Sequence, residues 1–186
     1  MSIRVERRHF NVTEYNLMGE RGILSEDDLV ELIEGEILKM SPIGSQHAAC
    51  VDRLNLLLVH FADQRAIVRV QNPIQLSDYS EPQPDFALLK PRDDFYAEMY
   101  PLPADVLLIV EVADTSLEYD RNVKVPLYAR AGIPEVWMVN LLENLIEIYT
   151  DPVSGLYQRI HMAKHGESLT LQFLADVTFS VDDVLS

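Results

Sequence analysis

Four polar side chains occur where the sequence otherwise predicts buried core, and their types indicate a shared chemistry. Glu111 interrupts the apolar run Val106 to Val112. Asp85 stands directly before a second apolar run, Phe86 to Leu89. An ionised carboxylate inside such a strand destabilises the fold by several kcal/mol unless it is paired or bound to a metal. The alternatives are an exposed strand end paired with an arginine for Glu111, and turn chemistry after a proline for Asp85.

The other two polar side chains lie on the inward stripes of predicted helices. Lys124 precedes Leu127 and Tyr128 by three and four residues, so it shares their helix face. His47 has a helical relation to Leu54 and so faces the same side as the core of its own helix. The alternatives are a lysine that extends to solvent along its aliphatic stem, and a histidine that is only a hydrogen-bonded core residue.

Taken together, these residues predict one polar cluster inside an apolar fold. Hard divalent cations such as Mg²⁺ bind carboxylate oxygens. A lysine beside such an ion orients the attacking water and stabilises negative charge on a phosphoryl group. The combination is typical of phosphodiester hydrolysis. The sequence contains no GxSxG, no Gly-rich phosphate loop and no HExxH motif, and its lone cysteine lacks the surroundings of a nucleophile.

Helices that could position the cluster are predicted from caps and apolar periodicity. Ser25 followed by acids indicates a helix start, with an apolar stripe that reaches Ile33 before a glycine ends it. The clearest periodicity covers residues 46–64, for which Ser45 is the candidate cap. A further helix is expected over residues 122–131, again ended by a glycine.

Strands are predicted in short runs between these helices. Residues 106–112 are apolar at nearly every position, which is typical of a central strand buried on both faces. Residues 145–149 and 157–162 flank a turn at 151–155 and predict an additional β-hairpin. With no repeat or linker in residues 1–186, we expect a single mixed α/β domain, a central sheet flanked by helices. The remaining strands are expected at 36–40, 67–70, 74–76, 86–89 and 135–139.

Composition limits the partners of the protein. The 186 residues include 15 Lys+Arg and 30 Asp+Glu, a net charge of −15. Such a chain repels nucleic acid at long range, so any binding must depend on a local basic patch or on bound cations. One cysteine forms no internal disulfide, and neither a signal peptide nor an apolar run of about 20 residues is visible. We therefore expect a soluble cytoplasmic protein with no membrane partner.

The segments that hold these residues resemble the PD-(D/E)XK nuclease signature. The resemblance is closer still to the Uma-type family of restriction-endonuclease-like proteins, long catalogued as a bacterial domain of unknown function. It extends over about residues 10 to 160. The stretches that carry it are 31–36, 40–42 with His47, 84–89, 110–116, 119–121 with Lys124, and 127–137.

The resemblance implies a restriction-endonuclease-like core and a metal site. The implied cofactor is Mg²⁺, with Mn²⁺ as a substitute, held by Asp85, Glu111 and the backbone carbonyl of Val112. The signature places a lysine where this chain has Ala113, so the role is expected to pass to Lys124 on the following helix. The catalytic side chains implied are Asp85, Glu111, Lys124 and His47, supplemented by one acid among Glu31, Glu34 and Glu36.

The expected function is therefore a Mg²⁺-dependent endonuclease that hydrolyses DNA phosphodiester bonds by attack of metal-activated water. One alternative is a catalytically idle binding module that retains the nuclease fold and metal pocket. Another is a structural protein whose polar cluster is a buried ion-pair network. A homodimer is expected by analogy with nucleases that cut duplexes. DNA is expected to bind weakly and in a salt-dependent way, through Lys39, Arg69, Lys90, Arg92 and Arg121.

Overall fold

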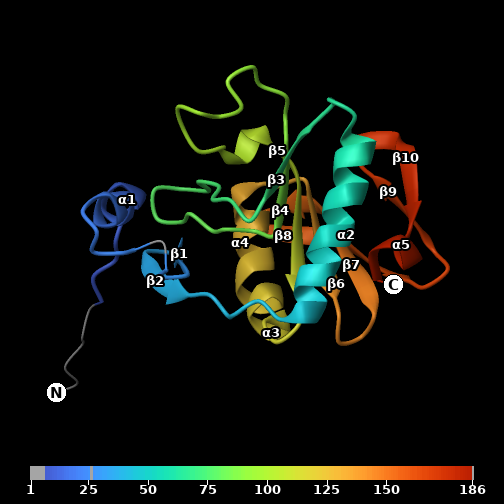
Figure 1. The fold of residues 1–186 in the computed structure, drawn as a ribbon, viewed down its shortest axis with the longest axis horizontal. Helices are drawn as coiled ribbons and strands as arrows, with labels where there is room; N and C mark the ends of the chain where they lie inside the picture. The colour runs from blue at the N-terminus through green and yellow to red at the C-terminus, as the bar shows by residue number, and fades with distance from the viewer. Residues whose placement is uncertain (1–6, 26, 186) are drawn as a thin grey trace.

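The centre of the structure is a six-stranded mixed sheet with the order β3-β4-β5-β6-β7-β8 (Figure 1). The computed structural model describes residues 7–25 and 27–185. Strands β5 and β6 run parallel, and the other neighbouring pairs of the sheet are antiparallel. The strands are β3 (Ile67–Val70), β4 (Phe86–Leu89), β5 (Val106–Ala113), β6 (Glu135–Asn140), β7 (Leu145–Val153) and β8 (Leu156–Lys164).

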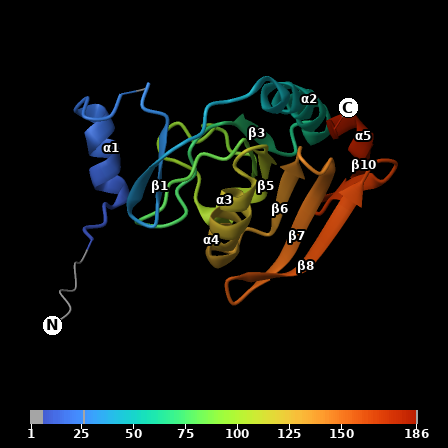
Figure 2. The ribbon, with the colours of Figure 1, turned by 90° about the horizontal axis from the view of Figure 1, so that it is seen from below.

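Helices cover both faces of this sheet (Figure 2). On one face lies α2 (Ser45–Ala62), and on the other lie α3 (Leu117–Tyr119), a π-helical turn (Asp120–Lys124) and α4 (Val125–Ala131). Strand β5 contributes alternate residues to both cores: Leu108, Val110 and Val112 face α2, whereas Ile109 and Ala113 face α4. The central strand is therefore buried on both sides, as predicted, and Glu111 points to the α4 side.

Smaller elements flank the sheet at its two ends (Figures 1 and 2). The N-terminal part packs as a helix and a hairpin beside the α4 side of the molecule. The C-terminal part extends the core that α2 covers, through a second hairpin and a short helix. These elements are α1 (Val12–Glu20), β1 (Val30–Ile33), β2 (Glu36–Lys39), β9 (Ser168–Leu171), β10 (Leu174–Ser180) and α5 (Val181–Leu185). A 3-10 turn (Pro103–Asp105) directly precedes β5.

The helix predicted after Ser25 is wrong, because this segment forms strand β1 and pairs antiparallel with β2. Ser25 instead closes a turn with Asp28. The two strands are joined by Glu34 and Gly35, which have φ angles of 49° and 83° and form a tight two-residue hairpin turn. A side chain at Gly35 would meet His9 at 2.5 Å, so the close approach requires glycine. The apolar residues of this segment fit a short helix and a strand equally well, and pairing with β2 selects the strand.

Other boundaries also differ from the prediction. Residues 74–76 form no strand, because their backbone N–H groups bond to loop carbonyls, those of Ser80, Pro82 and Pro101, rather than to a neighbouring strand. Helix α2 has Gly44, not Ser45, as its N-cap. The β7–β8 turn is shorter than predicted, since pairing continues to Val153 and Leu156. The elements α1, β9, β10 and α5 were not predicted from the sequence.

The remaining predicted elements are confirmed. The strands expected at 36–40, 67–70, 86–89, 106–112 and 135–139 are present, as are the long helix and the C-terminal hairpin. The helix expected over 122–131 continues the π-helical turn and ends at Gly132 in the left-handed conformation. In the part of the chain that the structure describes, no helix has the length and apolarity to cross a membrane.

Candidate active site

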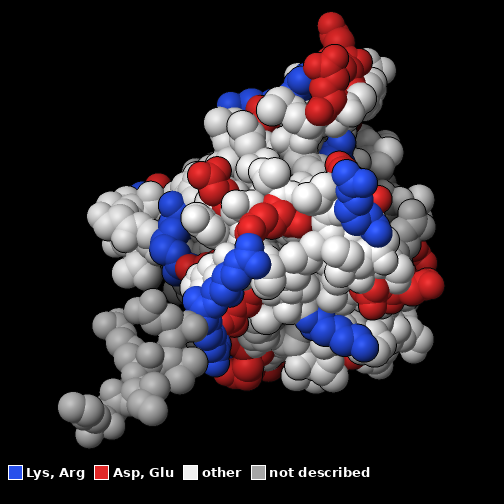
Figure 3. Space-filling model, turned by 90° about the vertical axis from the view of Figure 1, so that its left-hand side faces the viewer, with Lys and Arg blue, Asp and Glu red and all other residues white. Residues whose placement is uncertain are grey.

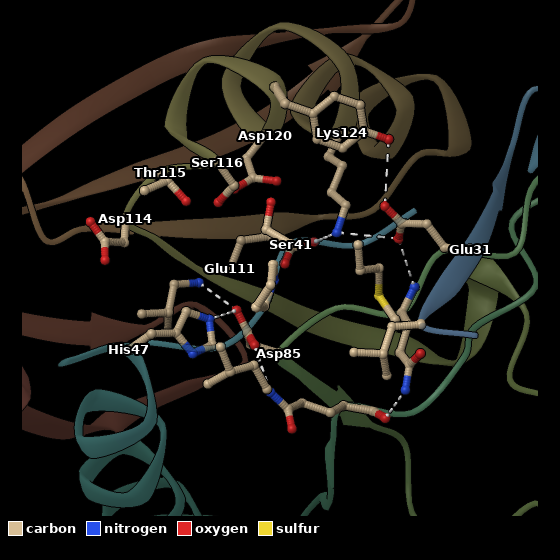
Figure 4. Close-up of a pocket in the computed structure, with 18 of the residues that line it drawn as sticks. Glu31, Ser41, His47, Asp85, Glu111, Asp114, Thr115, Ser116, Asp120 and Lys124 are labelled. Carbon is tan, nitrogen blue, oxygen red and sulfur yellow. Dashed lines mark hydrogen bonds and ion pairs between the residues drawn. The ribbon is translucent and has the colours of Figure 1, made fainter. Parts of the chain in front are cut away.

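A cavity of about 480 Å³ lies beside the end of β5, between the β1–β2 hairpin, the linker 40–44, the start of α2 and the α3 region (Figure 4). The chain segments that line it are far apart in sequence and meet only in the folded protein. The cavity brings together every side chain predicted for the site, and their chemical roles remain predictions. These lining residues are His47, Asp85, Glu111, Val112 and Lys124.

Asp85 is fixed at the floor of the cavity by three hydrogen bonds. Its Oδ2 accepts the backbone N–H of Val112 at 2.8 Å and lies 3.1 Å from Nε2 of His47. Its Oδ1 accepts a bond from the side-chain amide of Gln71 at 3.1 Å. The bond to Val112 exists because β4 and β5 pair antiparallel with Phe86 opposite Val110. Asp85 therefore lies next to the residue that follows Glu111.

Glu111 is 3% exposed and faces the helices rather than an exposed strand end. Its Oε1 accepts a 2.5 Å hydrogen bond from the hydroxyl of Tyr128 and lies 3.3 Å from Nζ of Lys124. Burial, with the nearby charges of Asp120 and Asp85, raises the pKa of Glu111 to about 8, although Lys124 and Tyr128 oppose the shift. At neutral pH the carboxyl group holds a proton unless a cation displaces it.

Lys124 is inward-facing, as its helical spacing predicted, and only 6% exposed. Its Nζ lies 3.3 Å from a carboxylate oxygen of Glu31 and 3.3 Å from one of Glu111. Burial alone lowers the pKa of Lys124, but the surrounding carboxylates, Glu111 first, outweigh it and raise the pKa above its ordinary value. The lysine is therefore a fixed cation rather than a proton donor. Lys124 is the last residue of the π-helical turn, and such local irregularities in helices are frequent at functional sites.

Glu31 is the member of the acidic segment that reaches the cavity. Besides its ion pair with Lys124, it accepts the backbone N–H of Gln83 at 3.2 Å and the hydroxyl of Tyr119 at 3.4 Å. The hairpin explains this placement, because successive residues of a strand point to opposite faces.

The other two acids of that segment point away from the cavity. Glu34 pairs with Arg130, and Glu36 pairs with Arg7. Both acids are substantially exposed in these pairs. Recognition of the hairpin in place of a helix would have distinguished Glu31 from its neighbours.

Two further residues of the site were not predicted from the sequence: Asp120, which lines the cavity, and Tyr128, which binds Glu111. They lie four residues before and four residues after Lys124, so helical spacing alone could have placed all three on one face. Burial is the main cause that raises the pKa of Asp120 above its ordinary value. The hydroxyl of Tyr128, fully buried, holds the carboxyl group of Glu111 in place.

His47 faces the cavity from the first turn of α2. The hydrogen bond to Asp85 raises the pKa of His47, and burial opposes this shift. Its Nδ1 is buried and has no hydrogen-bond partner in the structure over residues 7–25 and 27–185. The charge of Asp85 therefore favours the imidazolium form of His47, and the imidazole ring in turn orients the carboxylate of Asp85.

The cavity is acidic, and the basic side chains near it are few. Of the five predicted DNA contacts, Lys39 lines the cavity. Arg121 binds the buried carboxylate of Glu147, with its terminal nitrogen 2.5 Å from Oε1. The face shown in Figure 3 carries Lys and Arg interspersed with Asp and Glu, without a broad basic area. The remaining three are Arg69, which donates to the carbonyl of Phe95, Arg92, which pairs with Asp94, and the exposed Lys90.

The donor set in the cavity fits a hard divalent cation. Within the described chain, no group of three His, Cys, Asp or Glu side chains is placed to surround an ion. Mg²⁺ does not require one, because it is usually held by one or two carboxylates and keeps several waters. The carboxyl groups of Asp85 and Glu111, which both line the cavity, meet that requirement. Burial, together with the charges of Asp120 and Asp85, raises the pKa of Glu111, and a bound cation would favour its ionised form.

A mixed sheet covered by helices on both faces, with an acidic cavity at the end of its central strand, defines an α/β protein with a candidate site at that strand end. The fold is similar to that in the "Crystal structure of a putative nuclease belonging to DUF820 from Anabaena variabilis ATCC 29413", with a TM-score of 0.75 and 14% identity. The match covers 95% of this chain and 97% of that chain. The protein belongs to the Uma2 family, described as "Putative restriction endonuclease", whose model matches residues 13–182. None of the curated proteins matches the chain.

Proposed function

We propose that the protein is a Mg²⁺-dependent endonuclease that hydrolyses phosphodiester bonds of DNA. The observation that carries the proposal is the cluster in the cavity. Two carboxyl groups, that of Asp85 directly before β4 and that of Glu111 on the neighbouring β5, share it with a buried lysine whose amine lies 3.3 Å from Glu111. Family membership and the nuclease-like fold support the same reaction class.

Each side chain of the cluster has a distinct part in this proposal. Mg²⁺, held by Asp85, Glu111 and the carbonyl of Val112, would supply Lewis-acid activation of water and neutralisation of phosphate charge. Lys124 orients the attacking water and balances the negative charge that develops on the phosphoryl oxygens. His47 holds the carboxylate of Asp85 in position through its 3.1 Å contact.

A second candidate is a binding module that retains the fold and pocket without cleaving. Two observations favour it. The protein has a net charge of −15, and its basic side chains are interspersed with acids on the surface shown in Figure 3. Such a module would bind its ligand without cleaving it, so activity decides between the two.

The test is cleavage of supercoiled and single-stranded DNA in the presence of Mg²⁺, Mn²⁺ or a chelator. We expect metal-dependent cleavage by the wild type and its loss in Asp85→Asn. Asp52→Asn is the matched control, because Asp52 is exposed on α2 and does not line the cavity. Cleavage by Asp85→Asn at the wild-type rate would contradict the assignment of the site. Absence of cleavage by the wild type with either metal would favour the binding module.

A further inference from the structure

We propose that the cavity accepts an unpaired strand of nucleic acid and excludes a base-paired duplex. This inference rests on the proposed nuclease function and names its substrate. The side chains that would act on a phosphodiester lie deep: Glu111 is 3% and Lys124 6% exposed. They are reached through a cavity of about 480 Å³, the size of pockets that enclose single small ligands.

A duplex does not reach groups at this depth. Over the length of a binding site, double-stranded DNA is a stiff rod with a persistence length of about 50 nm, and its phosphates lie on its outer surface. It contacts residues that an open cleft presents. An unpaired strand bends freely, so one nucleotide can enter the cavity and bring its phosphodiester to Lys124, as enzymes that act on extruded nucleotides require.

The wall that narrows the cavity is held in place by backbone hydrogen bonds. The β1–β2 hairpin is tied to the loop before β4 by the bonds Glu81 N to Leu32 O and Gly35 N to Tyr79 O, both 2.7 Å. Glu31 adds its ion pair with Lys124 across the cavity. The entrance is therefore a built feature of the fold, and widening it for a duplex would break these contacts.

The lining chemistry also matches a single nucleotide. The lining combines the acids and Lys124 with aliphatic side chains, of which Leu29 is 47% and Ile43 56% exposed. A base can bury its flat apolar face against the aliphatic side chains while its phosphate faces the polar ones. The aliphatic lining residues are Leu29, Leu38, Met40, Pro42 and Ile43.

The charge of the cavity also favours an unpaired strand over a duplex. Proteins that bind duplex DNA commonly neutralise about 6–10 phosphates with Lys and Arg. The cavity lining contains two such cations, Lys39 and Lys124. A short unpaired segment presents few phosphates and needs few cations, whereas a duplex of the same length would place many phosphates against an acidic surface.

The experiment compares three labelled oligonucleotides of one sequence: a single strand, a duplex closed at both ends by hairpins, and the same closed duplex with a short internal bulge. With Mg²⁺ or Mn²⁺, we expect the single strand and the bulge to be cut about tenfold faster or more than the closed duplex. Equal or faster cleavage of the closed duplex would overturn the inference while leaving the nuclease function in place.

Binding separates the two proposals if nothing is cut. Fluorescence anisotropy with the wild type, without divalent metal, should show about tenfold tighter binding of the single strand than of the closed duplex. Ile43→Asp should remove this preference. Leu56→Asp, at a 74% exposed position of α2 outside the cavity, should retain it. Duplex binding as tight as single-strand binding, or an unchanged preference in Ile43→Asp, would overturn the inference independently of any activity.

Discussion

Replacement of Lys124 by methionine tests whether its buried ammonium group holds the acidic cavity together. The sequence left open a lysine that extends to solvent, whose truncation costs little. In the structure the amine is buried between Glu31 and Glu111, 3.3 Å from an oxygen of each. Methionine preserves most of the volume and removes the charge, so Lys124→Met leaves two buried carboxyl groups without their cation.

The expected loss of stability follows from these distances. At an effective dielectric constant of about 20, the contact of Lys124 with Glu31 at 3.3 Å corresponds to about 5 kcal/mol of attraction. Desolvation of the charged groups offsets a large part, and removal of one partner of a buried pair typically costs about 3–5 kcal/mol. Because the pKa of Glu111 is raised to about 8, this carboxyl group is mostly protonated at neutral pH and adds little to the penalty. We expect a loss of about 3 kcal/mol at neutral pH.

Urea denaturation of four proteins measures this effect: the wild type, Lys124→Met, Glu31→Gln and the double variant. Removing the carboxylate that lost its cation should restore part of the stability, with a coupling energy of about 0.5–3 kcal/mol. The penalty of Lys124→Met should also decrease toward acid pH, where the carboxyl groups are neutral. A free energy of unfolding of Lys124→Met within about 0.5 kcal/mol of the wild-type value would refute the buried ion pairs.

Cleavage by Lys124→Met should fall about 10²–10³-fold, the usual cost of losing one group that stabilises transition-state charge.

Three further outcomes concern the metal, pH and the support of the site. Mg²⁺ at about 100 times its dissociation constant should stabilise the wild type by about 2.7 kcal/mol in thermal melts, and Glu111→Gln should lose this effect. Because the pKa of Glu111 is raised to about 8, its proton competes with the ion, and the stabilisation should grow between about pH 6 and about pH 9. Burial raises the pKa of Glu81 from 4.5 to about 7, so the stability contributed by its neutral form is complete below pH 4.5 and is lost as pH rises through 7. Denaturation across that range should show the wild type losing up to about 3 kcal/mol relative to Glu81→Gln, and parallel curves would contradict this. Glu147→Gln weakens the anchor of Arg121 and so of the turn that carries Lys124; kcat should fall several-fold with the Mg²⁺ effect on melting retained, whereas an unchanged kcat would argue against a positioning role.

The sequence predicted the parts of the site that local patterns determine. Glu111 stands out because it interrupts an otherwise apolar strand. The eight residues of β5 form a run long enough for the sequence to show that the strand is buried on both faces. Lys124 follows from helical spacing with Tyr128. Asp85 follows from its place before a short apolar strand. For each of these, the residues that decide the position are neighbours in sequence.

The parts that were missed depend on contacts between distant segments. Residues 29–33 fit a short helix and a strand equally well, and the pairing of β1 with β2 and the bridge from Leu32 to Glu81 select the strand. The role of Glu31 follows from that choice. The hydrogen bond from Gln71 to Asp85 likewise depends on how a loop closes over the sheet. Such long-range selections are absent from single-sequence periodicity.

The charge balance of the cavity distinguishes a functional site from a structural ion-pair network. A network that only stabilises the fold needs matched charges, and well-packed apolar residues serve that purpose at least as well as a buried ion pair. Here one buried ammonium group, that of Lys124, faces several carboxyl groups, and burial, together with the charges of Asp120 and Asp85, raises the pKa of Glu111. The arrangement therefore costs folding energy that its own cation does not recover. Under the proposed function, a divalent cation would offset this cost, so the proposed function explains the excess of acid and a structural role does not. The acids in question are Glu31, Asp85, Glu111 and Asp120.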